Sequence, residues 1–85
     1  MSSDYSQDGI GQPASFAFDI TPDDNANLDV IPRAIYIGVT GDVKVDMARD
    51  GTVTFVGVAA GEILPIRVKR VYDTNTTATN IIGLY

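Results

Sequence analysis

The chain has 85 residues and a hydrophobic fraction of 45%, which excludes an intrinsically disordered protein and fits one small domain. It contains no cysteine and no histidine, which excludes disulfides, zinc fingers, a histidine general base and a thiol nucleophile. The net charge of −5 opposes nucleic-acid binding because phosphates repel an acidic surface, and the chain lacks the long apolar run of a membrane-spanning helix. We therefore expect no nucleic-acid and no membrane partner.

The acidic side chains are concentrated in the first part of the chain. Residues 1–32 contain six aspartates and no lysine or arginine, whereas residues 33–85 contain six basic and five acidic side chains. The two parts carry −6 and +1, which together give the net charge of −5. This asymmetry would allow the acidic part of one copy to attract the basic part of another.

The first residues predict a flexible arm. Residues 1–12 are rich in Ser, Asp, Gly and Gln, and their only large apolar side chains are Tyr5 and Ile10. This composition indicates a mobile segment that becomes ordered only against a neighbour. We expect the arm to cover residues 1–14 and a single β domain to cover residues 15–85.

The first predicted strand covers residues 15–20, where Phe16, Phe18 and Ile20 alternate with small or polar residues. The alternation predicts that these three side chains share a buried face. Residues 21–29 then break the pattern with Pro, Asp and Asn, which favour turns because Asx side chains bond to nearby backbone N–H groups. The proline would also suit the first position of a single helical turn.

Short alternating segments separated by glycine-containing turns occupy the centre of the chain. The predicted strands cover residues 34–39, 43–48, 52–58 and 63–71, and the predicted turns cover residues 40–42, 49–51 and 59–62. Asp-Gly in the second turn supplies the positive-φ residue that a tight hairpin needs. This rhythm predicts an up-and-down antiparallel arrangement in which consecutive strands pair.

The alternation also predicts which side chains of these segments face the core. The expected inward residues are Ile35, Ile37, Val39, Val43, Val45, Met47, Val53, Phe55, Leu64, Ile66 and Val68, whereas the side of Val56 and Val58 is ambiguous. Pro65 cannot donate an N–H to a ladder, which predicts an edge strand or a bulge.

The last part of the chain predicts a polar loop over residues 73–80 and a short strand over residues 81–85. No long helical pattern is present. The sequence therefore predicts an all-β fold, a small antiparallel β-sandwich or barrel of about six strands preceded by the polar N-terminal arm.

Catalysis and metal binding are not expected. The carboxylate pairs Asp23/Asp24 and Asp42/Asp46 lie in predicted turns or on predicted outer faces, where burial would not raise their pKa for acid–base work. The alternation of oxygen ligands over residues 23–29 resembles the start of a calcium loop, but the sixth position lacks glycine and the twelfth lacks glutamate. We expect no catalytic residue, no cofactor and no metal ligand, and weak calcium binding at residues 23–29 stays open.

Two sets of side chains are candidates for an interface. The basic set contains Arg33, Arg67, Lys69 and Arg70, and the aromatic set contains Tyr36, Tyr72 and Tyr85. The alternation predicts that Arg67 and Lys69 share one strand face, which is either simply solvated or meets the acidic segment of a neighbouring copy or an acidic patch of another protein. Each tyrosine combines an apolar ring with a polar tip and suits either an interface or the edge of a core.

Several segments resemble one family in their order and spacing. They are Pro-Arg-Ala-Ile-Tyr-Ile-Gly at residues 32–38, Thr-Gly-Asp-Val at residues 40–43, Gly-Glu-Ile-Leu-Pro-Ile-Arg-Val-Lys-Arg-Val at residues 61–71, the Thr/Asn tract after them and a chain end of the type Ile-x-Gly/Ala-Leu-Tyr at residues 81–85. Over residues 23–85 the chain resembles the head spike base family of tailed phages and gene transfer agents.

The resemblance implies a non-enzymatic virion structural protein on the capsid surface. Such a protein would bind the major capsid protein and support a spike or fibre protein. Five copies would fit a capsid vertex, because a fivefold axis offers five equivalent docking positions. The first alternative is a decoration protein that cements the capsid lattice as a trimer, and the second is a module that binds a host carbohydrate or peptide.

Overall fold

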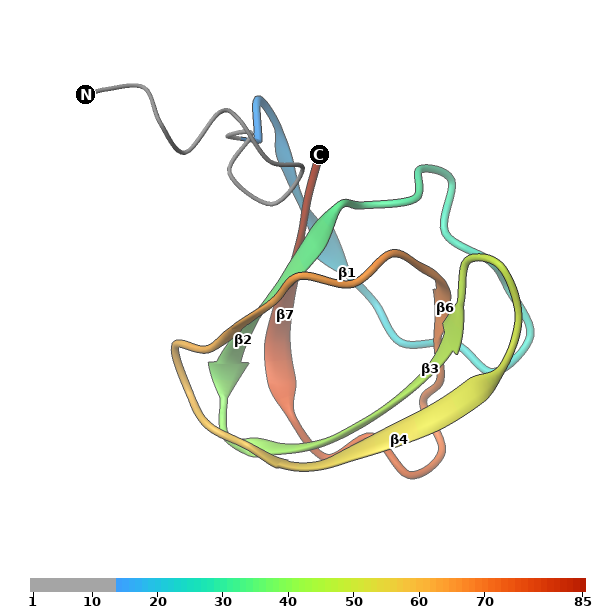
Figure 1. The fold of residues 1–85 in the computed structure, drawn as a ribbon. Helices are drawn as coiled ribbons and strands as arrows, with labels where there is room; N and C mark the ends of the chain where they lie inside the picture. The colour runs from blue at the N-terminus through green and yellow to red at the C-terminus, as the bar shows by residue number, and fades with distance from the viewer. Residues whose placement is uncertain (1–13) are drawn as a thin grey trace.

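The structure, a computed structural model, describes residues 14–85, and Figure 1 shows its fold. All but the last residue of the predicted arm lies outside the described residues. The strands of the described part are β1 (Ala17–Ile20), β2 (Ala34–Val39), β3 (Gly41–Met47), β4 (Thr52–Val58), β5 (Ile63–Leu64), β6 (Val68–Val71) and β7 (Thr79–Leu84).

These strands form two antiparallel sheets, with the order β1-β7-β2-β5 in one and β4-β3-β6 in the other. The strands curve around a shared interior (Figure 1). The prediction of a small, all-β, antiparallel fold is confirmed. Residues 14–85 contain seven strands instead of about six because one predicted strand is divided in two.

The predicted pairing of consecutive strands is wrong for most of the fold. β2 pairs with β5 and β7, and β7 also pairs with β1, so partners in this sheet come from distant parts of the sequence. Within residues 14–85, β3 and β4 are the one pair that is both consecutive and hydrogen-bonded. Their tight turn is confirmed, since Gly51 has a φ of 105° and its carbonyl accepts the Met47 N–H at 2.8 Å.

Gly41 begins β3 and does not form the hairpin turn predicted over residues 40–42. β2 and β3 belong to different sheets, and the chain crosses between the sheets here. A Cβ on Gly41 would lie 2.4 Å from the backbone nitrogen of Ala78, so the segment before β7 packs directly on the crossing. Thr77 secures the contact: its N–H donates to the Asp42 carbonyl and its hydroxyl accepts the Asp42 N–H, both at 2.8 Å. Close packing, and not a turn, requires this glycine.

The strand predicted over residues 63–71 is divided around Pro65. β5 ends at Leu64 on the edge of the first sheet, and β6 begins at Val68 on the edge of the second. A proline cannot continue a ladder because it has no N–H to donate. Its predicted place beside an edge strand is therefore confirmed, whereas the continuous strand is wrong.

A bulge in β4 decides the side of its last two valines. Gly57 is the extra residue where the register with β3 shifts; it has a φ of 69°, and its N–H donates to Asp42 Oδ1 at 2.9 Å. An extra residue reverses the alternation that follows it. Val58 therefore points into the core, whereas Val56 is 77% exposed.

The core lies between the two sheets and consists of aliphatic side chains. Its buried members in the described part are Ile20, Ile35, Ile37, Val43, Val45, Val58, Val68, Val71, Ala78 and Ile81. Three predicted inward residues are instead exposed: Phe16 to 63%, Val39 to 44% and Val53 to 42%. Each lies beside the end of a strand or on an edge strand, where the opposite sheet does not cover it.

The loop between β1 and β2 contains the predicted turn but no helical turn, and the structure describes this whole segment. Asp23 Oδ1 accepts the Asn25 N–H at 2.8 Å in an Asx turn. The loop then follows the outer edge of β6: the Asp23 N–H donates to the Val71 carbonyl at 2.9 Å, and the Leu28 N–H donates to the Lys69 carbonyl at 2.8 Å.

Candidate interaction surfaces

Tyr72, one residue after β6, links the strands of the second sheet. Its hydroxyl donates to Asp46 Oδ2 at 2.9 Å and its N–H donates to the Lys44 carbonyl at 2.8 Å. The Lys44 ammonium lies 4.7 Å from the ring centroid and the Arg70 guanidinium carbon lies 5.6 Å from it. An aromatic face attracts cations at these distances. We call Lys44, Asp46, Arg70 and Tyr72 the β3–β6 cluster.

Arg70 also fixes the loop between β1 and β2. Its Nε donates to Asn27 Oδ1 and its Nη1 donates to the Asp24 carbonyl, both at 2.9 Å. The structure thus brings together two predicted interface residues, Arg70 and Tyr72, but gives both of them partners within the chain. Lys44 was not among the predicted interface residues, and only the pairing of β3 with β6 shows that it belongs with them.

Asp24 closes the same loop against the segment after β6. Its Oδ1 accepts the N–H groups of Asp73 and Thr74 at 2.9 Å, and its Oδ2 accepts the Thr74 hydroxyl at 2.5 Å. The Thr74 hydroxyl and N–H, followed by the Asp73 N–H and the Lys44 charge, lower the pKa of Asp24 below its usual 3.8 because each favours the ionised carboxylate. Asp24 is therefore a charged acceptor that holds a loop.

Asp46 has the same character. Its Oδ1 accepts the Thr52 hydroxyl and its Oδ2 accepts the Tyr72 hydroxyl. The Thr52 hydroxyl first, then the Tyr72 hydroxyl and the charges of Lys69 and Arg70, lower the pKa of Asp46 below 3.8. A general acid at neutral pH needs a raised pKa, which neither Asp24 nor Asp46 has.

Arg33 immediately precedes β2, and Tyr36 lies on the outer side of that strand. The Arg33 N–H donates to the Leu84 carbonyl at 2.7 Å. Its Nε is buried and has no hydrogen-bond partner among residues 14–85, an arrangement that costs free energy. Tyr36 lies between the fully buried Ile35 and Ile37, so its side chain points away from the core. The place of both residues in an interface stays a prediction.

The shared face predicted for Arg67 and Lys69 assumed a regular strand. The chain here is not regular, because Arg67 precedes β6 and a register shift falls at Lys69. Arg67 precedes β6, and its carbonyl accepts the Ala48 N–H at 2.9 Å. Lys69 is the extra residue where the register of β6 with β3 shifts, so Val68 and Val71 both point into the core. Arg67 is exposed and Lys69 is half-buried, and their role in an interface is likewise untested.

Tyr85 anchors the segment before β1. Its N–H donates to the Phe16 carbonyl at 2.9 Å, and its own carbonyl accepts the N–H groups of Ser15 and Phe16 at 2.7 Å. Its ring stacks on Phe16 with the centroids 5.3 Å apart and meets the edge of Phe18 at 5.5 Å. The exposed Phe16 was predicted to be buried and is an interface candidate that the sequence missed.

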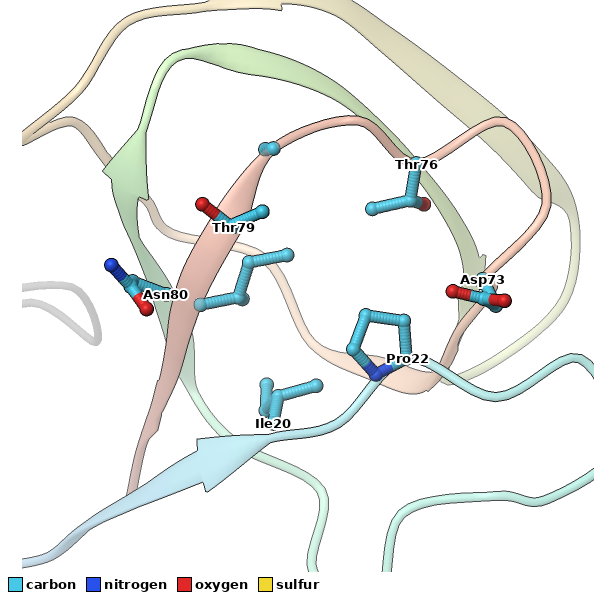
Figure 2. A pocket seen from close by; sticks show the side chains of 8 residues that line it. Ile20, Pro22, Asp73, Thr76, Thr79 and Asn80 are labelled. Carbon is cyan, nitrogen blue, oxygen red and sulfur yellow. The ribbon is translucent and has the colours of Figure 1, made fainter.

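A pocket lies between the end of β1 and the segment that leads into β7 (Figure 2). Ile20, Pro22 and Ile81 supply apolar surface, and Thr76 and Asp73 add polar groups. Asp73 is the one carboxylate in this lining.

The described part of the chain offers neither a cluster of metal ligands nor a membrane-spanning helix. Residues 14–85 contain no group of three or more Asp or Glu side chains that could hold a metal ion. At residues 23–29, where weak calcium binding stays open, the oxygens of Asp23, Asp24 and Asn27 accept hydrogen bonds from within the chain. No helix in the described residues is long and apolar enough to cross a membrane.

The chain is similar to a protein of known structure from a capsid. No protein-family model and no curated protein sequence matches the chain. Among solved structures, the chain is similar to a chain in the capsid of a native gene transfer agent particle, computed with C5 symmetry. The two are 38% identical, the match covers 92% of this chain and 90% of that one, and the TM-score is 0.82.

Proposed function

Because this chain belongs to the same family as the gene transfer agent capsid chain, we propose that it is a structural protein of a virion or gene transfer agent particle, located on the capsid. The similarity over nearly the whole of both chains is the observation that carries the proposal. The polar groups agree with a structural role, since the carboxylates of Asp24 and Asp46 hold loops and strands together.

The finer proposal is that the protein forms the oligomeric base of a head spike. It would bind the major capsid protein on one side and a spike or fibre protein on the other, with five copies around a vertex. Exposed apolar side chains such as Phe16 and Val56 favour burial in an assembly.

A trimeric decoration protein is the second candidate, because a capsid location fits it equally well. Cryo-EM of capsids that lack this protein, incubated with the purified chain, separates the two. Density at the fivefold vertices is expected for a spike base, and density across the lattice would favour decoration. Absence of binding to the capsid would overturn both.

Reversing the charge of one basic residue tests the predicted role of these residues in capsid binding. Arg67 is exposed, so Arg67→Glu should leave the fold intact and weaken co-sedimentation with capsids if this side meets an acidic surface. Arg67→Lys keeps the charge and is the matched control. Equal capsid binding by both variants would show that Arg67 does not contribute to the contact with the capsid.

A further inference from the structure

Each edge strand of the two sheets has a row of backbone groups that could pair with another chain, and native proteins usually protect such edges. In residues 14–85 the edge strands are β1 and β5 in one sheet and β4 and β6 in the other. The outer edge of β6 is covered, because the carbonyls of Lys69 and Val71 accept hydrogen bonds from the N–H groups of Leu28 and Asp23 in the loop between β1 and β2. β5 has only two residues and is followed by Pro65. These two edges are protected within the chain.

The edge of β4 is not protected. It is seven residues long, its sequence TVTFVGV contains no charge and no proline, and its one strand partner among the described residues is β3. Val53 and Val56 are exposed on it. A long, uncharged, β-branched edge invites pairing with another strand. The outer edges of β5 and β6 are therefore protected, whereas the outer edge of β4 is open to another strand.

The outer edge of β1 is also free of a strand partner among the residues that the structure describes. Phe16, immediately before β1, is 63% exposed, and Val56 on β4 is 77% exposed. These are the two most exposed large apolar side chains of residues 14–85, and they lie on the two uncovered edges. These two edges belong to different sheets, so one copy could pair through β4 with one neighbour and through β1 with another.

We propose that copies of this chain join by antiparallel pairing of β4 in one copy with β1 in the next, so that a sheet continues across the subunit boundary. The inference deepens the proposed function and rests on its claim that the protein is a homo-oligomer. A joint between two different edges is head-to-tail, and such joints form closed rings where the rotation between copies closes and open filaments where it does not. It is thus compatible with a five-membered ring, whereas pairing of β4 with itself would stop at a dimer.

Charge favours the antiparallel direction. Arg49 is exposed just before β4, and Asp19 is exposed near the end of β1. Antiparallel pairing brings the start of β4 beside the end of β1, and therefore Arg49 toward Asp19 of the next copy. The same direction brings Val56 toward Phe16, and with these two residues opposite each other Asp19 faces Val53 while Arg49 lies beyond the end of β1.

The test uses native mass spectrometry of the full chain and three lysine variants. Val56→Lys blocks β4, Phe16→Lys blocks β1, and Val39→Lys is the control, because Val39 is 44% exposed on β2, a strand paired on both sides. A charge on an edge strand opposes edge pairing. Each blocking variant should associate at least about tenfold more weakly than the wild type, and the control should assemble normally.

Mixing the blocked variants tests the head-to-tail joint itself. Val56→Lys retains β1 and Phe16→Lys retains β4, so an equimolar mixture should form a heterodimer and nothing larger. Assembly of Phe16→Lys alone would overturn the joint and indicate pairing of β4 with itself. Wild-type assembly by all variants, or a wild-type chain that stays monomeric, would also overturn it. Capsid binding by the same proteins reports separately on the proposed function.

Cross-linking provides a measurement that does not require the joint to be broken. The chain has no cysteine, so Phe16→Cys/Val56→Cys introduces its only two thiols. Oxidation should link copies covalently, because residues on neighbouring strands are close enough for a disulfide. Phe16→Cys/Val39→Cys is the matched control and should remain unlinked. Equal linking of both pairs would contradict the proposal.

Discussion

At the scale of single residues, Asp46 is the point at which the three strands of the second sheet are held together. It lies on β3, accepts the Thr52 hydroxyl of β4 and accepts the hydroxyl of Tyr72, which follows β6. Both hydrogen bonds favour the ionised form and lower the pKa of Asp46. The side chain that sequence analysis weighed as one of a pair of catalytic candidates is therefore a fixed acceptor.

This arrangement predicts an acid-sensitive contribution to stability. The pKa of Asp46 is below 3.8 in the folded chain, so the unfolded chain takes up its proton first as the pH falls. The contribution is complete above the usual pKa of 3.8 and is lost as the pH falls through the folded pKa. Urea unfolding should show that Asp46→Asn is less stable than wild type at pH 7 and loses less stability on transfer to about pH 3.

The control for this measurement is Asp29→Asn, which removes an exposed carboxylate from the loop between β1 and β2. It should reproduce the wild-type dependence on pH. If Asp46→Asn and wild type lose the same free energy of unfolding between the two pH values, Asp46 does not supply the acid-sensitive contribution.

At the scale of elements, the crossing from β2 to β3 determines how the two sheets are joined. β2 ends at Val39, and β3 begins two residues later in the other sheet. The backbone at Gly41 approaches Ala78 too closely for any side chain, and Thr77 bonds to Asp42 in both directions. The segment between β6 and β7, predicted as a polar loop, thus clamps the connection between the sheets.

Two glycine substitutions separate close packing from backbone conformation. Gly41→Ala places a Cβ 2.4 Å from a backbone nitrogen and should lower the free energy of unfolding by about 3 kcal/mol. Gly57→Ala meets nothing within 4 Å but has a φ of 69°, so it should lose only about 1–2 kcal/mol. Chemical denaturation of both variants provides the comparison. A larger loss at Gly57 would show that the crossing is less tightly packed than described.

At the scale of the whole molecule, both sheets share one core. Ile35 and Ile37 come from the first sheet and Val43 and Val45 from the second, and all four are fully buried. Neither sheet can bury its apolar face without the other, so we expect the described part to unfold as one cooperative unit.

Truncation of one core residue should therefore weaken both sheets. Ile37→Ala should cost about 2–5 kcal/mol, and amide hydrogen exchange should accelerate in β3 as well as in β7. The matched control is Ile63→Ala, the same substitution at a 53% exposed position, with little expected effect. Loss of protection confined to the first sheet would contradict a shared core.

The local chemistry of the sequence was sufficient for the class of fold and most of its elements. Period-two alternation identified β2 and β3 and the buried Ile35, Ile37, Val43 and Val45, although it was wrong for Val39 at the end of β2, and Asp50-Gly51 identified the hairpin between β3 and β4. These features depend on neighbours in sequence: the pleat determines the face of each side chain, and a positive φ determines the turn. The bulge at Gly57 reversed the face of Val58, and the alternation alone left that valine ambiguous.

Only the tertiary structure decided which strands pair and which candidate residues meet. The partners of β2 come from β5 and β7 because apolar faces are buried by contacts between distant segments, which local patterns do not encode. The same pairing brought Lys44 and Asp46 of β3 to Arg70 and Tyr72 and left β4 and β1 uncovered. Sequence by itself determined an acidic, all-β chain; the burial of two sheets against each other decided which strand edges of the described residues lie at the surface.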